Sequence, residues 1–368
     1  MSERCAIVGS GLAALAAYST LRRGGFESAE IAVFGTHEDP LEVWRIRAAA
    51  IRQRRMRSES DGHLGAAAFP GLAVREAARR HSVRPLLRTA TSTYHPSVDD
   101  FLRHGAELAE RLGWSSSLHL RRVQTIGVTP TGFEVDGDGP FHHLLLATGH
   151  AALNVPDELA GDVRVVHAYE PHDYASRVVV VGAGMAAAHE WLNALAAGSE
   201  VVSVRRREPV RRPLSVPREL FSRRGLQPFH RAETLARTAA LRMLEAASYP
   251  PGRGWDAPIR EAAQSQRYRV GNARDLNGWA EQIICATGFR GGWASDPLVA
   301  DLVERNGLET HERWLVLAPD STVPGLTQDD RTLSVAGVAG RWAFPGSDSI
   351  AGAKYAARAF LHRACRTP

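Results

Sequence analysis

Residues 5–17 read CAIVGSGLAALAA, a short apolar run that passes through two glycines into an alanine- and leucine-rich segment. This order predicts a strand, a tight turn and a helix. Gly9 would allow the turn, Gly11 would let a phosphate group approach the backbone next to Ser10, and Ala14 would let the helix pack closely on the strand. Because a helix N-terminus carries free N–H groups and a positive dipole end, the stretch predicts a loop that binds a dinucleotide pyrophosphate.

The same design recurs at residues 178–191, VVVVGAGMAAAHEW. Four consecutive valines predict a strand buried in a parallel sheet. Gly182, Gly184 and Ala187 take the three positions for small residues, and Met185 would open the helix. One match of this kind is a weak signal, but two matches, each after a strand and before a helix, predict two dinucleotide-binding units. The alternative is two tight strand–helix turns that bind nothing.

Two further apolar runs end in Ala-Thr-Gly: HLLLATGH at 143–150 and QIICATGF at 282–289. Small residues at the end of a strand suit a chain that passes close to a cofactor, where a larger side chain would clash. The candidate cofactor contacts in these runs are Thr148, Gly149, Thr287 and Gly288.

Two glycine loops, each followed by an Ala-Thr-Gly strand, resemble the two-dinucleotide-domain flavoproteins over nearly the whole chain. The resemblance implies an α/β fold with two Rossmann-like domains, in which the first loop holds FAD and the second holds NAD(P)H. The NADP domain would be inserted into the FAD domain. We expect the first part of the FAD-binding domain at 1–160, the NADP-binding domain with a partly helical insertion at 161–284, and the second part of the FAD-binding domain at 285–368.

The C-terminal residues 331–360 predict a strand, a turn that contains Gly340 and a helix from about Ser349. The Ser-Asp-Ser run at 347–349 offers candidates for the N-cap. In the superfamily this helix points its positive N-terminus at the flavin ring, so the resemblance implies cofactor contacts from Ser349 and Ile350.

The three cysteines, Cys5, Cys285 and Cys365, lie far apart and form no Cys-x-x-Cys. This spacing argues against a dithiol redox centre, a disulfide framework and a cysteine zinc site. Disulfide reductases of the superfamily carry a cysteine pair beside the flavin, so we exclude their branch. The flavin-dependent monooxygenases and the ferredoxin-reductase-like electron carriers remain.

Trp44 favours the monooxygenases. It closes the stretch IAVFGTHEDPLEVW, residues 31–44, which is predicted to be the second strand of the first unit and the loop that follows. In class B flavin-dependent monooxygenases, including N-hydroxylases and Baeyer–Villiger-like enzymes, an acid at the end of this strand is followed by Gly-Gly-x-Trp. Trp44 keeps that register, nine residues after Gly35, and the resemblance implies that it contacts the cofactor.

The same stretch departs from the family pattern at three positions. Gly35 stands where the acid would hold the FAD ribose, and Leu41 and Glu42 replace the two glycines. A lost hydrogen bond to a buried partner costs about 1–3 kcal/mol, roughly ten- to a hundredfold in affinity. Glu38 or Asp39 could reach back from the following loop, so we expect FAD to bind, though loosely. The rival hypothesis is a lineage that has abandoned FAD.

The second unit indicates its own nucleotide more directly. Its predicted second strand runs into Arg205, Arg206 and Arg207, where an NAD site would place an acid. Guanidinium groups suit the 2′-phosphate of NADP because they form paired, charge-assisted hydrogen bonds. We therefore expect NADPH rather than NADH, and the alternative is an exposed basic turn.

Residues 51–72, IRQRRMRSESDGHLGAAAFPGL, are similar in placement to the monooxygenase segment that crosses the flavin face. The candidate catalytic residues are Arg57, Ser58, Glu59 and Asp61. Arg57 would stabilise a peroxyflavin or hold the NADP pyrophosphate, and Glu59 or Asp61 would steer a substrate amine or relay a proton. The alternative is a solvated polar loop.

Composition excludes several other classes. The formal net charge is +5, but the arginines are scattered among acids, so no nucleic-acid partner is expected. No run approaches the roughly 18 apolar residues that span a bilayer, so we expect no membrane partner and a cytoplasmic location. No His, Cys or carboxylate spacing indicates a metal site, and His142 and His143 are expected at the surface.

The resemblance implies an FAD- and NADPH-dependent monooxygenase, with a biosynthetic role, that oxygenates a small molecule with dioxygen through a flavin hydroperoxide. Heteroatom hydroxylation and Baeyer–Villiger oxidation both stay open. One alternative is an NADPH-dependent flavin reductase that passes electrons to a protein partner. If FAD is absent, the alternative is a non-catalytic NADP-binding protein. The oligomeric state stays open, with a homo-oligomer among the options.

Overall fold

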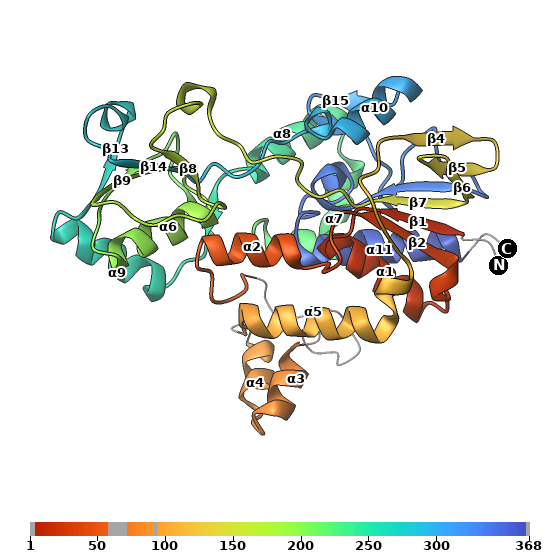
Figure 1. Ribbon diagram of the computed structural model, residues 1–368, viewed down its shortest axis with the longest axis horizontal. Helices are drawn as coiled ribbons and strands as arrows, with labels where there is room; N and C mark the ends of the chain where they lie inside the picture. Colours follow the sequence, from red (N-terminus) through yellow and green to blue (C-terminus); the bar gives the residue numbers. More distant parts are fainter. Residues whose placement is uncertain (1–3, 58–71, 92–93, 366–368) are drawn as a thin grey trace.

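The computed structural model describes residues 4–57, 72–91 and 94–365. Two five-stranded sheets lie toward opposite ends of an elongated molecule (Figure 1). Every strand pairing inside these two sheets is parallel. The expected α/β fold with two Rossmann-like units is therefore confirmed.

The first sheet is assembled from both ends of the chain. Its strand order is β17-β7-β1-β2-β3. The strands are β1 (Cys5–Val8), β2 (Ile31–Gly35), β3 (Leu118–Leu120), β7 (His143–Leu146) and β17 (Thr332–Val335). Because β17 follows the whole second sheet in sequence, the second unit is inserted into the first.

The second sheet lies wholly within residues 165–285 and has the order β13-β10-β9-β14-β8. Its strands are β8 (Val165–His167), β9 (Arg177–Val181), β10 (Glu200–Val204), β13 (Tyr268–Gly271) and β14 (Gln282–Cys285). In both sheets the strand before the glycine loop is central. It lies between the next strand in sequence and the strand that carries Ala-Thr-Gly.

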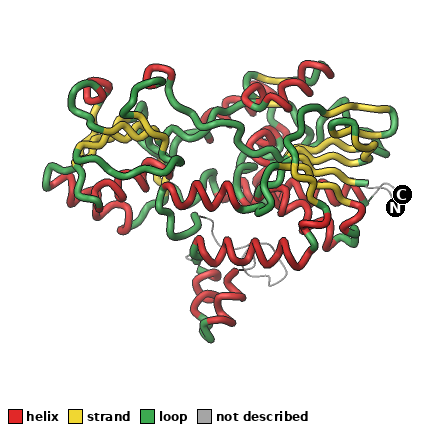
Figure 2. The backbone as a smooth tube through the Cα atoms, in the orientation of Figure 1, coloured by secondary structure: helices red, strands yellow, loops and turns green. Residues whose placement is uncertain are grey.

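Helices cover these sheets and connect them (Figure 2). In the first unit α1 (Leu12–Arg23) packs against α11 (Ile350–Ala364), and α5 (Val98–Leu112) packs on α1. In the second unit α6 (Met185–Ala196) packs on β9 and on α9 (Arg253–Gln264). The remaining helices are α2 (Glu42–Ala50), α3 (Leu72–Arg79), α4 (Arg84–Ala90), α7 (Arg223–Arg231), α8 (Thr234–Leu244) and α10 (Pro297–Asn306).

Short strands complete the fold. An antiparallel meander consists of β4 (Ile126–Thr129), β5 (Gly132–Val135) and β6 (Asp138–Phe141). Two small pairs are β11 (Val210–Arg211) with β12 (Ser248–Tyr249), and β15 (Thr310–His311) with β16 (Trp314–Leu315). Between β10 and β13 the chain forms α7, α8 and α9.

The helix expected near the C-terminus begins where its cap predicts. Among the three N-cap candidates at 347–349, Ser349 is the cap, and its Oγ accepts a hydrogen bond from the Gly352 amide at 3.1 Å. The same hydroxyl donates to the Gly346 carbonyl at 2.6 Å. The first turn of α11 is therefore fixed against the loop that follows β17.

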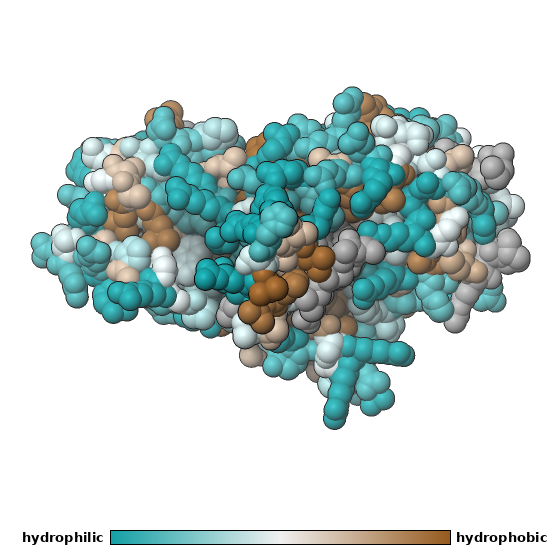
Figure 3. Space-filling view, turned by 90° about the horizontal axis from the view of Figure 1, so that it is seen from below, coloured by the Kyte–Doolittle hydropathy of each residue, from teal (hydrophilic) through white to brown (hydrophobic). Residues whose placement is uncertain are grey.

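Figure 3 shows the molecule from below, where hydrophilic residues dominate and hydrophobic ones gather near the centre, over the α3–α4 hairpin. Val83 and Leu87 belong to this hairpin and are exposed. No helix in the ranges 4–57, 72–91 and 94–365 is long and apolar enough to cross a bilayer.

One surface expectation is wrong. His143 is the first residue of β7 and is fully buried, because the strand register turns its ring toward Phe360 of α11. Neither ring nitrogen has a hydrogen-bond partner within the described part of the chain. Burial, helped by the charges of His142 and Arg4, lowers the pKa of His143 to about 4.

This histidine predicts a pH dependence of folding. Between pH 6.5 and 4 an unfolded histidine binds a proton that the folded chain excludes, so stability falls as the pH falls. Replacing His143 by leucine should stabilise the protein by about 2 kcal/mol more at pH 5 than at pH 8. Urea unfolding at both pH values measures this, with the exposed His362→Leu as the matched control. An unchanged pH dependence in His143→Leu would contradict the assignment.

Candidate functional site

The two glycine loops share one geometry. Gly9 follows β1 with φ +115°, and a Cβ placed on it would lie 2.2 Å from the Ala147 carbonyl oxygen. Gly182 follows β9 with φ +137°, and its Cβ would lie 2.3 Å from the Ala286 carbonyl oxygen. Each loop therefore crosses directly over the alanine of its Ala-Thr-Gly strand, and only glycine fits there.

Beyond these turns, both helix N-termini are open. Gly11 is the N-cap of α1 and Gly184 is the N-cap of α6, and no side chain caps either helix. A Cβ at either glycine would meet nothing within 4 Å. Ala14 and Ala187 are fully buried, so each helix lies close to its sheet. Free N–H groups facing open space are what a pyrophosphate requires, so the residues present fit a dinucleotide in both units.

The two Ala-Thr-Gly strands point toward each other. His150 and Phe289, which directly follow the two motifs, are in contact, with ring centroids 3.9 Å apart and ring planes tilted by 31°. Phe289 also stacks on Tyr169 at 5.1 Å, and the Arg47 guanidinium lies 4.4 Å from the Phe289 centroid. Burial lowers the pKa of His150 to about 4, so its ring is neutral in this contact at neutral pH. The carboxyl ends of β7 and β14 thus lead to one junction.

The sequence contains a signal for this junction that was not among the expectations above. Both motifs are followed by a ring, His150 in one and Phe289 in the other. A repeated motif that ends in a ring residue each time indicates a shared structural position. That signal would have identified the contact between the two units.

Thr287 and Gly288, the cofactor contacts predicted in the second Ala-Thr-Gly, form hydrogen bonds within the protein. The Thr287 hydroxyl donates to the Asn154 carbonyl. The Gly288 carbonyl accepts from the Asn154 amide at 3.0 Å and from His167 Nε2 at 3.0 Å. Thr287 and Gly288 therefore hold the connection that leaves the first sheet.

In the first unit, Thr148 and Gly149 lie partly buried at the corresponding place. The neighbouring glycine is Gly337, with φ +73°, and its Cβ would lie 3.9 Å from the Gly149 Cα. Gly340 is buried one turn later, where its carbonyl accepts from Phe344. Gly337, which no sequence motif singles out, is thus the glycine beside the Ala-Thr-Gly strand.

Gly35 has no room for the acid of the family pattern. A Cβ there would lie 2.4 Å from both Cβ and Oγ of Ser10 and 2.7 Å from the Ser10 backbone nitrogen. Ser10 is 4% exposed, and its hydroxyl accepts from the His37 amide at 3.0 Å. The end of β2 and the first glycine loop are therefore in direct contact.

The two other departures from the pattern lie at the start of α2. Leu41 is buried against Gly105 of α5, where any Cβ would come within 2.1 Å of the leucine Cδ1. Trp44 packs on Phe101, with ring centroids 5.0 Å apart. Leucine is tolerated in place of a glycine because another glycine faces it, and Trp44 is anchored in the core of the first unit.

The acids just before α2 and at its first residue are used in different ways. Asp39 accepts from the Leu41 amide at 2.8 Å and pairs with Arg45 at 3.3 Å. Glu42 contacts His37 Nδ1 at 3.1 Å. The Asp39 carboxylate therefore serves the local turn.

The three arginines after β10 also differ. The side chain of Arg205 is 12% exposed, pairs with Glu208 at 2.9 Å and lies 5.8 Å over the Trp191 ring. Arg206 and Arg207 are exposed. Two guanidinium groups are therefore accessible to an anion at the end of β10, and a third is held beside them.

Arg57 is bound by backbone carbonyls from another part of the chain. Its guanidinium donates to the carbonyls of Arg212, Pro213, Leu214 and Ser248 over 2.8–3.2 Å, and to the Ser248 hydroxyl at 3.1 Å. Burial, together with the Arg212 charge, lowers its pKa to about 10, so the group stays charged at neutral pH. The other candidates Ser58, Glu59 and Asp61 lie outside the described residues.

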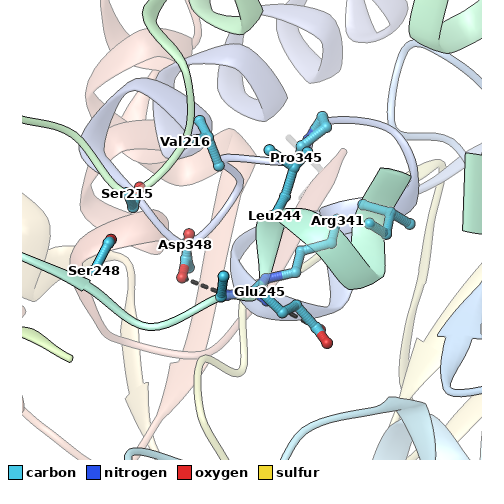
Figure 4. A pocket seen from close by; sticks show the side chains of 10 residues that line it. Ser215, Val216, Leu244, Glu245, Ser248, Arg341, Pro345 and Asp348 are labelled. Atoms are coloured by element: carbon cyan, nitrogen blue, oxygen red, sulfur yellow. Dashed lines mark hydrogen bonds and ion pairs between the residues drawn. The ribbon is translucent and has the colours of Figure 1, made fainter. Parts of the chain in front are cut away.

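A cavity of about 130 Å³ lies next to this arginine, at the N-terminal end of α11. Figure 4 shows its lining, which comes from α8, from the loop before α11 and from the segments around Ser215 and Ser248. Arg341 pairs there with Asp348 at 2.7 Å and with Glu245 at 3.2 Å. Apolar walls are supplied by Val216, Leu241, Leu244 and Pro345. No sequence pattern predicts this pocket, because its parts come from distant segments.

The two buried cysteines are unsuited to thiol–disulfide chemistry. Cys5 and Cys285 are buried in different sheets, and burial raises their pKa values to about 12 and about 11. Cys365 is exposed and free. Among the side chains that the structure describes, no group of three or more His, Cys, Asp or Glu could hold a metal ion.

Comparison with known families gives one match. The sequence model of the family described as pyridine nucleotide-disulphide oxidoreductase matches residues 3–219, more than half of the chain. A comparison with curated proteins finds no match.

Solved structures resemble the whole chain at low identity. Ornithine N-hydroxylase from Kutzneria sp. 744, with reduced FAD, NADP⁺ and L-ornithine, gives a TM-score of 0.74 at 16% identity, covering 100% of this chain and 99% of that one. The FAD-bound cadaverine monooxygenase DfoA from Erwinia amylovora gives 0.73 at 13%, covering 99% and 94%. Bacillithiol disulfide reductase from Bacillus cereus gives 0.63 at 14%, covering 100% of both chains.

These similarities confirm the expected resemblance to two-dinucleotide-domain flavoproteins at the level of the fold. Two hydroxylating or oxygenating enzymes and a disulfide reductase share that fold. The choice among reactions therefore depends on the residues of this chain.

Proposed function

Because the chain belongs to the pyridine nucleotide-disulphide oxidoreductase family, we propose that it is an FAD- and NADPH-dependent monooxygenase of a small molecule. The observation that carries the proposal is that each unit has an open helix N-terminus, and that the two Ala-Thr-Gly strands lead to one junction at His150 and Phe289. A flavin in the first unit and a nicotinamide in the second would each extend toward it. Such a pair supplies hydride transfer and activation of dioxygen.

The residues that we propose for each cofactor belong to the two glycine loops and to the segments named with them in the sequence. FAD would be held by the loop 9–11, by Thr148 and Gly149, and by the first turn of α11 at Ser349 and Ile350. NADPH would be held by the loop 182–185 and by the arginines at 205–207. Trp44 contributes by packing the start of α2 beside the first site.

The cysteines and the pocket favour oxygenation over the other reactions of the family. Cys5 and Cys285 are buried with raised pKa values in separate sheets, so disulfide reduction has no dithiol to use. A pocket at the N-terminus of α11 gives a small molecule a place near the junction. A carrier that hands electrons to a protein does not require such a pocket.

The substrate we propose is a small amine. The pocket presents the carboxylates of Asp348 and Glu245, with Arg341 between them. A carboxylate favours an ammonium group, and Arg341 could accept a second, anionic end of the substrate. The similar solved structures include enzymes whose names specify ornithine and cadaverine. Arg57, next to the pocket through Ser248, would place positive charge near the reacting atoms, and Ser58, Glu59 and Asp61 stay candidates for proton transfer.

The direct test is spectroscopic. Purified protein is titrated with FAD, reduced by NADPH without oxygen, and then exposed to air with and without amines. We expect a flavin spectrum that NADPH bleaches and oxygen restores, and ¹⁸O from ¹⁸O₂ in a hydroxylated amine. Rapid reduction of ferredoxin without oxygen incorporation would favour the electron carrier. Protein that stays colourless with excess FAD would refute the proposal.

The arginines after β10 predict nucleotide choice. Replacing both Arg206 and Arg207 by alanine should raise the Kd for NADPH about 10- to 100-fold, because charge-assisted bonds to the 2′-phosphate are lost. The Kd for NADH should be unchanged. Fluorescence titration of both nucleotides measures this, with the exposed Arg358→Ala in α11 as the control for lost charge. Equal weakening of NADPH and NADH would contradict a 2′-phosphate site.

A further inference from the structure

We propose that Glu42, positioned by His37, supplies the carboxylate that binds the ribose hydroxyls of the dinucleotide in the first site. The acid that Gly35 cannot carry would thus have moved to the first turn of α2. This inference rests on the proposed function, because it assumes that the first unit binds FAD.

The usual position is closed to an acid. Gly35 contacts Ser10 so closely that a Cβ would overlap its side chain and its backbone nitrogen. A carboxylate at position 35 would therefore require the glycine loop itself to move. A ribose-binding acid has to come from another part of the chain.

The chain beyond Gly35 leads such an acid back to the loop. Two residues later, the His37 amide donates to the Ser10 hydroxyl at 3.0 Å, so this segment lies across the first glycine loop. The His37 ring then contacts the Glu42 carboxylate, with Nδ1 and Oε2 3.1 Å apart. His37 therefore contacts both Ser10 of the glycine loop and the Glu42 carboxylate.

Glu42 is also accessible to a ligand. Its side chain is 36% exposed and that of His37 is 35% exposed. The contact with His37 uses Oε2, which leaves Oε1 for a hydroxyl. A carboxylate that accepts from ribose hydroxyls is the interaction that the strand-end acid makes in dinucleotide folds.

The neighbouring acids are less suitable. Both oxygens of Asp39 are engaged, one by the Leu41 amide and the other by Arg45. Glu38 is exposed, and its carbonyl accepts from Trp114 Nε1, which fixes its backbone toward the short turn that follows α5. The sequence hypothesis that Glu38 or Asp39 reaches back is thus less favoured by the geometry than Glu42.

The test compares FAD with an FAD analogue that lacks the adenosine 2′-hydroxyl. Quenching of flavin fluorescence gives Kd values for the apoprotein and its variants, and NADPH affinity and Tm serve as controls for folding. In the wild type, removal of the hydroxyl should weaken binding about tenfold. Glu42→Gln should bind FAD about tenfold more weakly and should show no further loss with the analogue.

Four further variants sharpen the comparison. Glu38→Gln and Asp39→Asn should retain both wild-type FAD affinity and the penalty for the missing hydroxyl. His37→Ala should shrink that penalty, whereas His37→Asn, whose amide nitrogen can replace Nδ1, should keep it. A structural role for His37 would change Tm but not the penalty.

The outcomes separate the two proposals. If the wild type binds FAD and Glu42→Gln shows the same affinity or the same penalty, only the assignment of Glu42 is overturned. If Glu38→Gln loses the penalty instead, the acid is Glu38. If the wild type binds no FAD, the proposed function fails and the assignment fails with it.

Discussion

Replacing Gly184 by valine is expected to raise the Kd for NADPH at least about 100-fold and to leave FAD binding unchanged, whereas Gly11→Val should do the reverse. Both glycines are uncapped N-caps with extended backbones, and an added Cβ meets no protein atom within 4 Å. The space that valine would fill is the space a pyrophosphate needs next to the free N–H groups. The loss should therefore fall on the ligand rather than on the fold.

Isothermal titration with each nucleotide measures the two affinities, and Tm measures folding. The controls are Gly9→Ala and Gly182→Ala, which place a Cβ within 2.3 Å of a backbone carbonyl in a left-handed turn. Those variants should lower Tm strongly as well as affinity, whereas the valine variants should stay near the wild-type Tm. A valine variant that binds its nucleotide normally would refute the pyrophosphate site in that unit.

The second large effect concerns Arg57. Replacing it by alanine should reduce the free energy of unfolding by about 3 kcal/mol, because four carbonyls and the Ser248 hydroxyl lose their shared donor. Urea unfolding followed by circular dichroism measures the loss. The matched control is Arg55→Ala, since Arg55 donates to the single carbonyl of His95 on the exposed surface.

Arg57→Lys should recover part of the loss, because an ammonium group cannot reach all of these acceptors at once. If Arg57→Ala instead keeps its stability and loses only turnover, the guanidinium acts mainly on the reaction. That result would support the role over the flavin that the sequence suggests and would contradict the structural role.

Local pattern was sufficient to predict the two glycine turns between strand and helix. Gly9 and Gly182 have to be glycine because the backbone turns over an alanine carbonyl, and this requirement is visible in a short stretch of sequence. The strand, loop and helix that surround each of them follow from the same local rules. The N-cap at Ser349 was predictable for the same reason.

Features that depend on distant partners were not predictable. Leu41 is tolerated because Gly105 faces it from α5, and sequence spacing gives no sign of that pairing. His143 was expected at the surface, ahead of a strand, but it is the first residue of β7 and the register of that strand places it inside. The pocket beside Asp348 is built by residues from 215–216, 241–248 and 341–348, so only the folded chain brings them together.

The helix α2 makes contacts near both of its ends, one with each of the two units. It begins beside the first glycine loop, where Glu42 contacts His37, and just beyond its end the Ile51 carbonyl accepts from Asn193 of α6 at 2.9 Å. Nine residues of helix make a rod about 14 Å long. Because a helix of this length barely bends, a displacement of its start is carried to its far end. The segment beside the first glycine loop and the helix that begins at the second glycine loop are thus joined through α2.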